Sequence, residues 1–329
     1  MRAWRVEKLT PAGEMALRDV PMPVAAGDAC VVRVEAAGVN FLDTLMLRGQ
    51  YQVKPPLPFT PGIEVVGIVT QAGPDSPYAV GARICAMMDL GGYAEYAVVP
   101  RLGSELVPDG MTAREAAGLP IIYPTAIMAL RHRAALQPGE TVLVHAGAGG
   151  VGSAAIQLAK HWGARVIATA GGAAKVALCR ELGADVAIDY RAEPIAEAVR
   201  RETGGRGVDV VFDPVGGDVT KESLRCLAWG GRLVIVGFAG GSIAELPANR
   251  LLLKNAAAMG VYWGAYRTHH PEIVDQVFRD IFDLHRQGVI RPLVRDVFPL
   301  EQAERALQAI ASRETVGKVV LLPGSEAAP

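Results

Sequence analysis

The sequence predicts a two-domain α/β protein, in which a doubly wound parallel sheet accompanies a β-rich domain. Three observations support this prediction. The chain has 329 residues, enough for two domains at roughly 100–200 residues each. Its first third contains short apolar runs between Gly- and Pro-rich turns, which is typical of a strand-rich domain. From residue 140 onward, apolar strands alternate with helix-length segments, which indicates βαβ units and a parallel sheet.

The first third is expected to supply four strands and one or two helices. The alternating or apolar runs lie at 29–39, 64–73, 82–88 and 92–100. A helix is expected over 109–120, because Thr112 followed three residues later by Glu115 matches a capping box. A second helix is expected over 124–136, and Pro138-Gly139 ends it.

The middle of the chain is expected to alternate regularly between strand and helix. Strands are predicted at 141–147, 164–170, 186–190, within 207–216, and at 232–240. Helices are predicted at 151–163, 173–183, 194–205 and 219–231. Short β-branched runs suit strands that are covered on both faces.

The tail returns to a mixed pattern. A strand-like run spans 256–266, helices are expected at 271–288 and 301–312, a strand at 318–322, and a frayed end at 324–329. This order suggests that the last segment rejoins the first domain. The expected domains are therefore 1–122 with 258–329, and 123–257.

Composition excludes several functional classes. The 33 basic and 34 acidic residues give a net charge of −1, whereas nucleic-acid surfaces usually show a basic excess. The scattered cysteines, Cys30, Cys85, Cys179 and Cys226, form no CxxC pair, so we expect buried thiols in a reducing compartment rather than a zinc knot. With no signal-peptide pattern and no apolar run near the ~20 residues of a membrane span, a soluble cytoplasmic protein is expected.

One glycine-rich turn carries the main chemical signal. Gly147-Ala148-Gly149-Gly150-Val151-Gly152 follows an apolar strand and opens a helix, which is the context of the dinucleotide-binding Rossmann motif. Gly147 would make the tight turn, Gly149 would admit a pyrophosphate, and Gly152 would allow close packing of helix and strand. The phosphates would bind free amides at the helix N-terminus.

The choice of nicotinamide cofactor is predicted from the end of the next strand. An acid about 20 residues after the glycines would bind the ribose 2′-hydroxyl. The chain instead has Thr169, five small residues that include Gly171 and Gly172, and then Lys175, which suits a 2′-phosphate and favours NADPH. The alternative is that Lys175 is an ordinary solvated residue in the first turn of its helix.

Beyond the glycine turn, several segments of the chain together resemble the medium-chain dehydrogenase/reductase superfamily, and within it the zinc-free quinone oxidoreductase branch that includes zeta-crystallin. The similarity covers essentially the whole chain, through AAGVNFLDTLMLRGQY, PFTPGIEVVGIV, HAGAGGVGSAAIQLAK and DVVFDPVGG. It implies a Rossmann domain and a GroES-like catalytic domain. Asn40 and Ile63 stand where the zinc enzymes of the superfamily place cysteine and histidine ligands, so no metal is expected.

The resemblance also implies a set of cofactor contacts. The pyrophosphate would meet Gly149, Gly150, Val151 and Gly152. The adenosine phosphate would meet Gly171, Lys175 and Tyr190. The nicotinamide end would meet Asn40, Thr125, Gly237 and Phe238. Tyr190 has the alternative of simply capping a strand, and Phe238 that of packing in the core.

Candidate catalytic residues are Asn40, Asp43 and Tyr51. Asn40 could donate a hydrogen bond to the acceptor oxygen, where negative charge grows during hydride transfer, or order the nicotinamide ribose. Asp43 could orient Asn40 or a water, or be a helix cap. Tyr51 could be a donor or a packing residue. Leu45 stands where this branch often has a tyrosine, which suggests a more apolar pocket.

The expected function is NADPH-dependent, zinc-independent reduction of quinones or α,β-unsaturated carbonyls. One alternative is an enoyl-thioester (acryloyl-CoA-type) reductase, with Arg48, Lys54 and Arg267 binding the CoA phosphates. Another is a crystallin-like or RNA-binding protein that holds NADPH without turnover. No nucleic-acid or membrane partner is expected. Tyr262, Trp263 and Tyr266 could help to close the active site or lie in a core or subunit interface, and a homodimer through the late apolar strand is predicted.

Overall fold

The computed structural model describes residues 1–324, so that of the expected frayed end only residue 324 is described. The chain forms two compact units. The first unit comprises 1–121, 264–283 and 291–329, and the second comprises 122–263 and 284–290. The tail therefore rejoins the first part of the chain. Residues 258–260 lie in a strand of the second unit's sheet, because they pair with the strand before them.

The second unit contains a six-stranded, fully parallel sheet. Its spatial order is β10-β9-β8-β11-β12-β13, which is the strand order 3-2-1-4-5-6 of a Rossmann fold. The strands are β8 (Thr141–Val144), β9 (Arg165–Ala170), β10 (Val186–Asp189), β11 (Val208–Asp213), β12 (Leu227–Ile235) and β13 (Ala257–Gly260). All carboxyl ends therefore lie at one edge, and all amino ends at the opposite edge.

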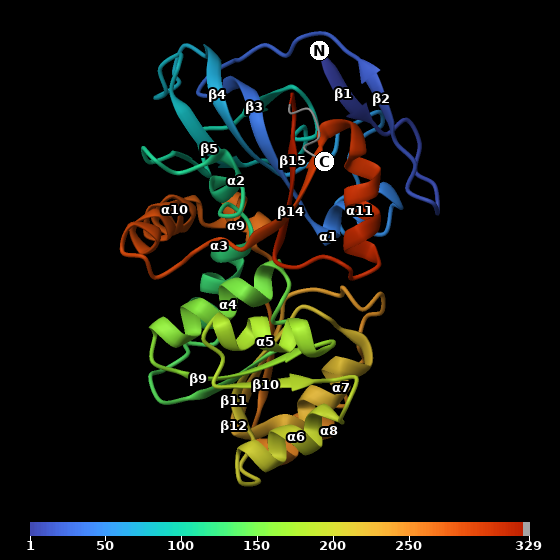
Figure 1. Ribbon diagram of the computed structural model, residues 1–329, viewed down its shortest axis with the longest axis vertical. Coiled ribbons are helices and arrows are strands. Elements are labelled where there is room, and N and C mark those ends of the chain that lie inside the picture. Colours follow the sequence, from blue (N-terminus) through green and yellow to red (C-terminus); the bar gives the residue numbers. More distant parts are fainter. Residues whose placement is uncertain (325–329) are drawn as a thin grey trace. The chain divides into compact units, whose positions relative to one another are not determined.

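Helices cover both faces of this sheet (Figure 1). They are α3 (Ile122–Ile127), which continues into the π-helical turn η1 (Met128–Arg133), α4 (Gly150–His161), α5 (Ala173–Glu181), α6 (Ile195–Glu202), α7 (Gly217–Cys226) and α8 (Ala248–Lys254). The predicted helix at 219–231 was too long. It ends at Cys226 because Leu227 already pairs with Val208 in the sheet. The helix α8 was not predicted.

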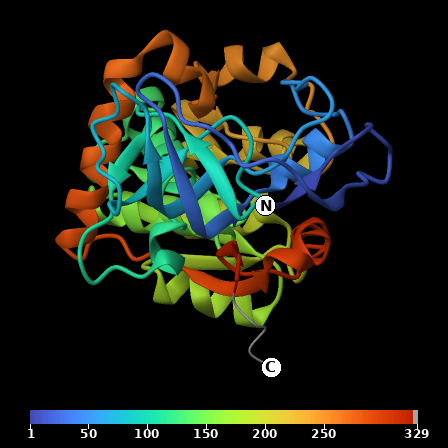
Figure 2. The same ribbon diagram turned by 90° about the horizontal axis from the view of Figure 1, so that it is seen from above.

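The first unit is built on a mainly antiparallel sheet of seven strands, ordered β14-β15-β3-β4-β5-β7, with β6 also paired to β3. The strands are β3 (Cys30–Val39), β4 (Glu64–Ala72), β5 (Arg83–Met87), β6 (Tyr96–Val99), β7 (Ser104–Leu106), β14 (Val294–Pro299) and β15 (Lys318–Leu322). The red C-terminal strands thus join the blue N-terminal strands in one sheet (Figures 1 and 2).

Smaller elements complete the first unit. They are the pair β1 (Arg2–Arg5) and β2 (Ala16–Asp19), and α1 (Phe41–Leu47), α2 (Ala113–Ala116), α9 (Tyr266–His269), α10 (Pro271–Arg286), η3 (Leu300–Gln302) and α11 (Ala303–Ala311). The end of α10, from residue 284, belongs to the second unit. The capping box is confirmed: Glu115 N donates to Thr112 Oγ1 at 3.2 Å, and Thr112 N donates to the Glu115 carboxylate at 3.0 Å. The helix after it is a single turn, shorter than expected.

The run at 256–266 is a strand only at β13. It continues as a short 3-10 turn, η2 (Trp263–Ala265), and then as α9. All four cysteines are free and buried, and burial raises the pKa of the Cys30 thiol to about 11. Among residues 1–324, no helix combines the length and apolar character needed to cross a bilayer.

Candidate active site

The glycine turn of the second unit presents free amides at the carboxyl edge of the parallel sheet. Gly149 caps α4, and the Ser153 amide makes the helix's first return bond, to the Gly149 carbonyl, at 2.9 Å. The amides of residues 150–152 therefore precede the first intrahelical bond and are available to a ligand. A Cβ atom on Gly152 would overlap the Ala146 carbonyl, so this position keeps α4 close to β8.

Gly147 was expected to make the tight turn, but it is not the residue with the left-handed backbone conformation. The left-handed residue is Ala146, with φ of 51°, one position before Gly147. A Cβ on Gly147 would come within 2.9 Å of Cys179 Sγ and 3.0 Å of Ala168 Cβ. Gly147 is thus required for packing against β9 and α5, while Ala146 makes the bend.

Two further candidate residues meet at the ends of β9 and β10. A Cβ on Gly171 would lie 2.6 Å from the Tyr190 hydroxyl and 2.9 Å from Arg191 Nε. Asp189 holds this corner, because its Oδ1 accepts from the amides of Gly172 and Arg191, each at 3.0 Å. Lys175 lies in the first turn of α5 and is half-buried.

Arg191 is a further candidate, which the sequence alone does not indicate. It is exposed, and its guanidinium lies beside Gly171 and Gly172. The signal in the sequence was weak, since a single arginine after a predicted strand is ordinary. Its place beside Gly171 depends on the parallel pairing of β9 with β10.

The other side of the carboxyl edge is formed by the turns after β11 and β12. Gly237 and Phe238 follow β12, and this turn is tied to the one after β11 by Ala239 N to Pro214 O at 3.0 Å and Gly240 N to Val215 O at 2.7 Å. Phe238 packs against that turn, because a Cβ on Gly216 would lie 2.8 Å from its ring. Thr125 lies in α3 and is buried.

His145 lies just before the glycine turn and has a structural role. Its Nδ1 is 3.0 Å from Thr169 Oγ1 and its Nε2 is 2.8 Å from Ser223 Oγ. Burial lowers the pKa of this imidazole. The ring therefore ties β8 to β9 and α7.

In the first unit, three neighbouring strands bring a polar cluster together. Val319 pairs with Val39, which places Lys318 next to Asn40, and Ala37 pairs with Val65, which places Glu64 next to Gly38. A Cβ on Gly38 would overlap the Glu64 carboxylate. The glycine of the AAGVN segment is thus explained by the side chain that crosses it.

The amide of Asn40 is held in one orientation. Lys318 Nζ donates to Asn40 Oδ1 at 2.6 Å and also contacts Glu64 Oε1, while Asn40 Nδ2 donates to Glu64 Oε1 at 2.7 Å. Because an ammonium can only donate, the amide oxygen must face Lys318. One of the two Asn40 N–H bonds is used by Glu64. The other is left for a ligand, since Asn40 is partly exposed.

The cluster contains a buried ion pair. The side chains of Lys318 and Glu64 are 2% and 0% exposed. Their mutual attraction must offset the cost of removing both charges from water. Neither Glu64 nor Lys318 was selected from the sequence as a site residue, because 254 positions separate them.

Asp43 lies behind Asn40 and is fully buried. Its Oδ2 accepts from the Asn40 backbone amide at 2.8 Å and from the Tyr93 hydroxyl at 2.7 Å. Burial raises the pKa of Asp43 to about 6, although these two hydrogen bonds oppose the rise. Burial beside Asp43 likewise raises the pKa of Tyr93. The bond from the Asn40 backbone amide to the Asp43 carboxylate is a capping-box bond at the start of α1, so the helix-cap alternative for Asp43 agrees with the structure. Through this bond Asp43 also positions Asn40.

The remaining candidates of the first unit lie as follows. Tyr51 is half-buried in the bend after α1, and Ile63 is buried at the start of β4. Within the described chain, His, Cys, Asp and Glu side chains form no group of three that could hold a metal ion. Arg267 pairs with Asp89 at 2.9 Å, whereas Arg48 and Lys54 are exposed.

The aromatic residues of the 256–266 run do not share one environment. Trp263 is buried, whereas Tyr262 is 48% exposed. The Tyr266 ring lies 5.7 Å from the His270 ring.

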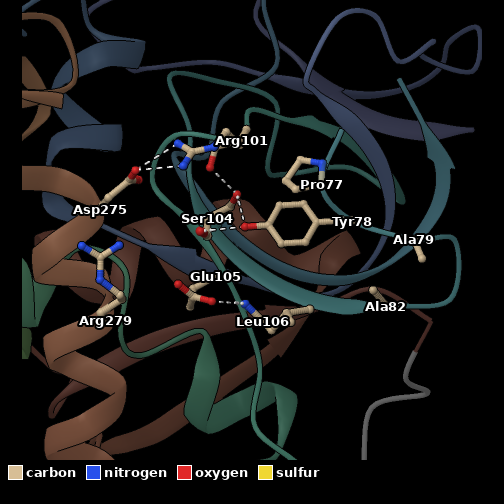
Figure 3. Close-up of a pocket in the computed structure, with 10 residues that line it drawn as sticks. All are labelled: Pro77, Tyr78, Ala79, Ala82, Arg101, Ser104, Glu105, Leu106, Asp275 and Arg279. Atoms are coloured by element: carbon tan, nitrogen blue, oxygen red, sulfur yellow. Dashed lines mark hydrogen bonds and ion pairs between the residues drawn. The ribbon is translucent and has the colours of Figure 1, made fainter. Parts of the chain in front are cut away.

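The first unit also contains a pocket that is lined by none of the candidate site residues (Figure 3). Its polar groups bind one another: Arg101 pairs with Asp275 at 3.0 Å, and the Tyr78 hydroxyl donates to the Ser104 carbonyl at 2.8 Å. Because these polar groups already have partners within the protein, we assign them a structural role and no ligand.

The chain matches two protein families and resembles known quinone oxidoreductases in sequence and structure. Residues 26–109 match the alcohol dehydrogenase GroES-like domain, and residues 150–279 match the zinc-binding dehydrogenase family. The chain is 43% identical over 303 residues to rat quinone oxidoreductase-like protein 2, covering 92% of this chain and 86% of the relative.

Two solved structures resemble the whole chain. One is a mycobacterial protein complexed with NADPH, with 36% identity and a TM-score of 0.91, covering 98% of this chain and 100% of that one. The other is Escherichia coli quinone oxidoreductase complexed with NADPH, with 30% identity, a TM-score of 0.90 and the same coverage.

Proposed function

Because the chain belongs to the quinone oxidoreductase branch of the medium-chain dehydrogenase/reductase superfamily, we propose that it uses NADPH to reduce quinones or α,β-unsaturated carbonyls without zinc. The observation that carries the proposal is that one chain contains both of the following features. The second unit has a glycine turn with free helix amides, and the first unit has an Asn40 amide held in one orientation.

The cofactor residues follow from the carboxyl edge of the parallel sheet. The amides of Gly150, Val151 and Gly152 bind the pyrophosphate, because their N–H groups and the dipole of α4 favour negative charge. Gly149 leaves space for the phosphates, since a Cβ there would meet only the Ala146 carbonyl, at 3.3 Å. Thr125, Gly237 and Phe238 contact the nicotinamide half.

Preference for NADPH over NADH rests on the corner formed by β9 and β10. Tyr190 and Arg191 supply a hydroxyl and a positive charge beside Gly171. Lys175 adds a second positive charge in the first turn of α5, which begins just after Gly172. We expect Lys175→Ala to weaken NADPH at least about tenfold, the scale of one charge-assisted hydrogen bond, and NADH much less. Titration calorimetry with both cofactors tests this, and an equal loss for both would contradict the phosphate role.

The reducing chemistry is supplied by the bound cofactor, which transfers hydride. The chain positions the acceptor and stabilises the charge that grows on its oxygen. The N–H of Asn40 not used by Glu64 is the donor that we assign to that oxygen. Its orientation is held from both sides by Lys318 and Glu64, so it requires no rearrangement during the reaction. Tyr51 is a second donor in this proposal, and Asp43 is a positioning residue.

Zinc independence is supported by the cluster around Asn40. An amide has replaced a thiolate, and the Lys318 ammonium already contacts both Asn40 Oδ1 and Glu64 Oε1. A zinc ion at this place would be repelled by that cation. Conjugated acceptors suit such a site, because they accept hydride without the polarisation that a metal supplies.

The direct test is oxidation of NADPH, followed at its near-ultraviolet absorbance, with 9,10-phenanthrenequinone and 1,4-benzoquinone as acceptors. We expect turnover with enzyme freed of metal by a chelator, and a large loss of kcat in Asn40→Ala. An enzyme that binds NADPH but oxidises it with no quinone or enone would refute the proposal in favour of the non-catalytic alternative.

The thioester alternative has less support. It needs free cations for the CoA phosphates, and Arg267 is already paired with Asp89. Arg48 and Lys54 remain. Crotonyl-CoA in the same acceptor panel separates the two reactions, since preferential turnover of the thioester would favour the alternative.

We also propose that the protein is a homodimer through β13. This strand is an edge of the sheet, and Ala257 and Gly260 are exposed on it. An uncovered strand edge readily pairs with another strand, and charged side chains block such pairing. Ala257→Lys should therefore yield monomers in light scattering after size exclusion, whereas Ala79→Lys, on an exposed residue of the first unit, should not.

A further inference from the structure

A second pocket of the second unit lies at the edge of the sheet opposite the glycine turn. Its walls come from α6, the turn at 205–207 before β11, the end of α7, the first residues of β12, and α8. These segments are all at the amino ends of strands, whereas the glycine turn follows the carboxyl end of β8. Figure 1 shows α6, α7 and α8 grouped in this region. The cavity volume is about 630 Å³, within the usual range for a single small ligand.

The pocket is strongly basic. Five cationic side chains line it and no acidic side chain does; they are Arg200, Arg206, Arg225, Arg250 and Lys254. This concentration occurs in a chain whose net charge is −1. Burial, with the nearby charges of Arg250 and Arg200, lowers the pKa of Lys254. The cations therefore repel one another in the absence of a counter-charge.

Three of these cations are available to bind an anion. Arg206 is bound to Asp209 at 2.7 Å, and Lys254 Nζ donates to the backbone carbonyls of Arg225, at 3.0 Å, and Leu227. The guanidinium groups of Arg200, Arg225 and Arg250 are exposed and form no hydrogen bond or ion pair with residues 1–324. Guanidinium groups bind phosphate oxygens in pairs, with matching geometry.

The pocket also contains an exposed tryptophan. Trp229, near the start of β12, is 74% exposed, although an indole ring usually gains stability by burial. Its neighbour Gly230 has φ of 74°, and the bend leaves the ring at the rim of the pocket. An exposed indole face beside arginines offers a stacking surface for a flat base.

We propose that this pocket binds a nucleoside polyphosphate, with the phosphates on Arg200, Arg225 and Arg250 and the base stacked on Trp229. The site is distinct from the NADPH site because it lies at the opposite edge of the sheet, and it does not rest on the proposed reaction. A pocket of about 630 Å³ suits one nucleotide. A nucleic-acid strand would need an extended basic groove.

The test is titration calorimetry with ATP on the full chain, with and without saturating NADPH. We expect one ATP per chain, bound equally in both conditions and weakened by salt. Arg200→Ala, Arg225→Ala, Arg250→Ala and Trp229→Ala should each weaken ATP at least about tenfold, the scale of one charge-assisted hydrogen bond or one stacked base. Arg18→Ala removes an exposed arginine of the first unit and should leave ATP binding unchanged.

Several outcomes would overturn the proposal. No ATP binding would do so directly, as would displacement of ATP by NADPH, which would place ATP in the cofactor site. Inorganic tripolyphosphate binding as tightly as ATP, with no effect of Trp229→Ala, would replace a nucleotide site with a bare anion site. Single-stranded RNA binding far more tightly than ATP through the same arginines would indicate a polymer. Since these side chains are exposed, unchanged thermal unfolding midpoints are expected and separate lost binding from misfolding.

Discussion

The buried carboxyl of Asp43 should make the stability of the protein depend on pH, and Asp43→Asn should remove that dependence. The Asp43 pKa rises from 3.8 to about 6 in the folded chain because of burial. Between about pH 4 and 6 the folded state therefore holds a proton that the unfolded state has released. Raising the pH through this window favours unfolding.

The magnitude follows from the two pKa values. A rise from 3.8 to about 6, at 1.36 kcal/mol for each pKa unit, corresponds to about 3 kcal/mol, as an order of magnitude. A side-chain amide does not titrate, so the Asp43→Asn variant should gain about 2 kcal/mol of this relative to the natural chain between about pH 4 and 7. The amide also places an NH₂ group where Asp43 Oδ1 has no partner within residues 1–324. The effect of this NH₂ group on stability is independent of pH, so it does not change how the stability difference between the two chains varies with pH.

Urea unfolding of both chains at about pH 4, 5, 6 and 7 measures the difference. Asp75→Asn is the matched control, because Asp75 is exposed in the same unit, and it should show no such slope. The carbon resonance of the Asp43 carboxyl gives the pKa directly. A stability difference that stays constant across this range, or a carboxyl that titrates below pH 4, would show that Asp43 is not held in the way described.

Three further outcomes test the site. Gly152→Ala should reduce NADPH affinity by more than about tenfold in calorimetry, because its Cβ would overlap the Ala146 carbonyl and displace the amides of α4; unchanged affinity would exclude that turn as the phosphate site. Lys318→Met should destabilise the chain by about 3–5 kcal/mol in urea by leaving Glu64 buried and unpaired. Adding Glu64→Gln should restore much of that loss, and simple addition of the two effects would contradict the pairing. Arg191→Ala should raise KM for NADPH more than for NADH, and equal effects would remove Arg191 from the phosphate site.

The parallel sheet could be predicted from sequence because its signals are local. Each strand is a short apolar run followed by a helix with its own start and end, and the glycine turn lies between one such strand and helix. The errors occurred where pairing decides the structure. Leu227 belongs to a strand because it pairs with Val208, which the helical pattern around it cannot show.

The polar cluster around Asn40 could be predicted only in part. Asn40 and Asp43 are close in sequence, and their spacing suggested both a site and a helix cap. Lys318 lies 278 positions from Asn40, and only the register of β15 against β3 brings them together. Arg191 was missed for the same reason, since the pairing of β9 with β10 places it at Gly171. Local patterns locate the elements, and side chains that meet across strands require the fold.

The position of β15 between β14 and β3 has a consequence for how the chain is made. A ribosome releases the N-terminal strands long before residues 318–322 exist, so until then the Glu64 carboxylate lacks the Lys318 ammonium and residues 37–39 of β3 lack the strand that pairs with them on that side. The second unit, whose sheet is complete by residue 260, can form while the first still waits. The last strand to be synthesised is thus the one that closes the Asn40 site.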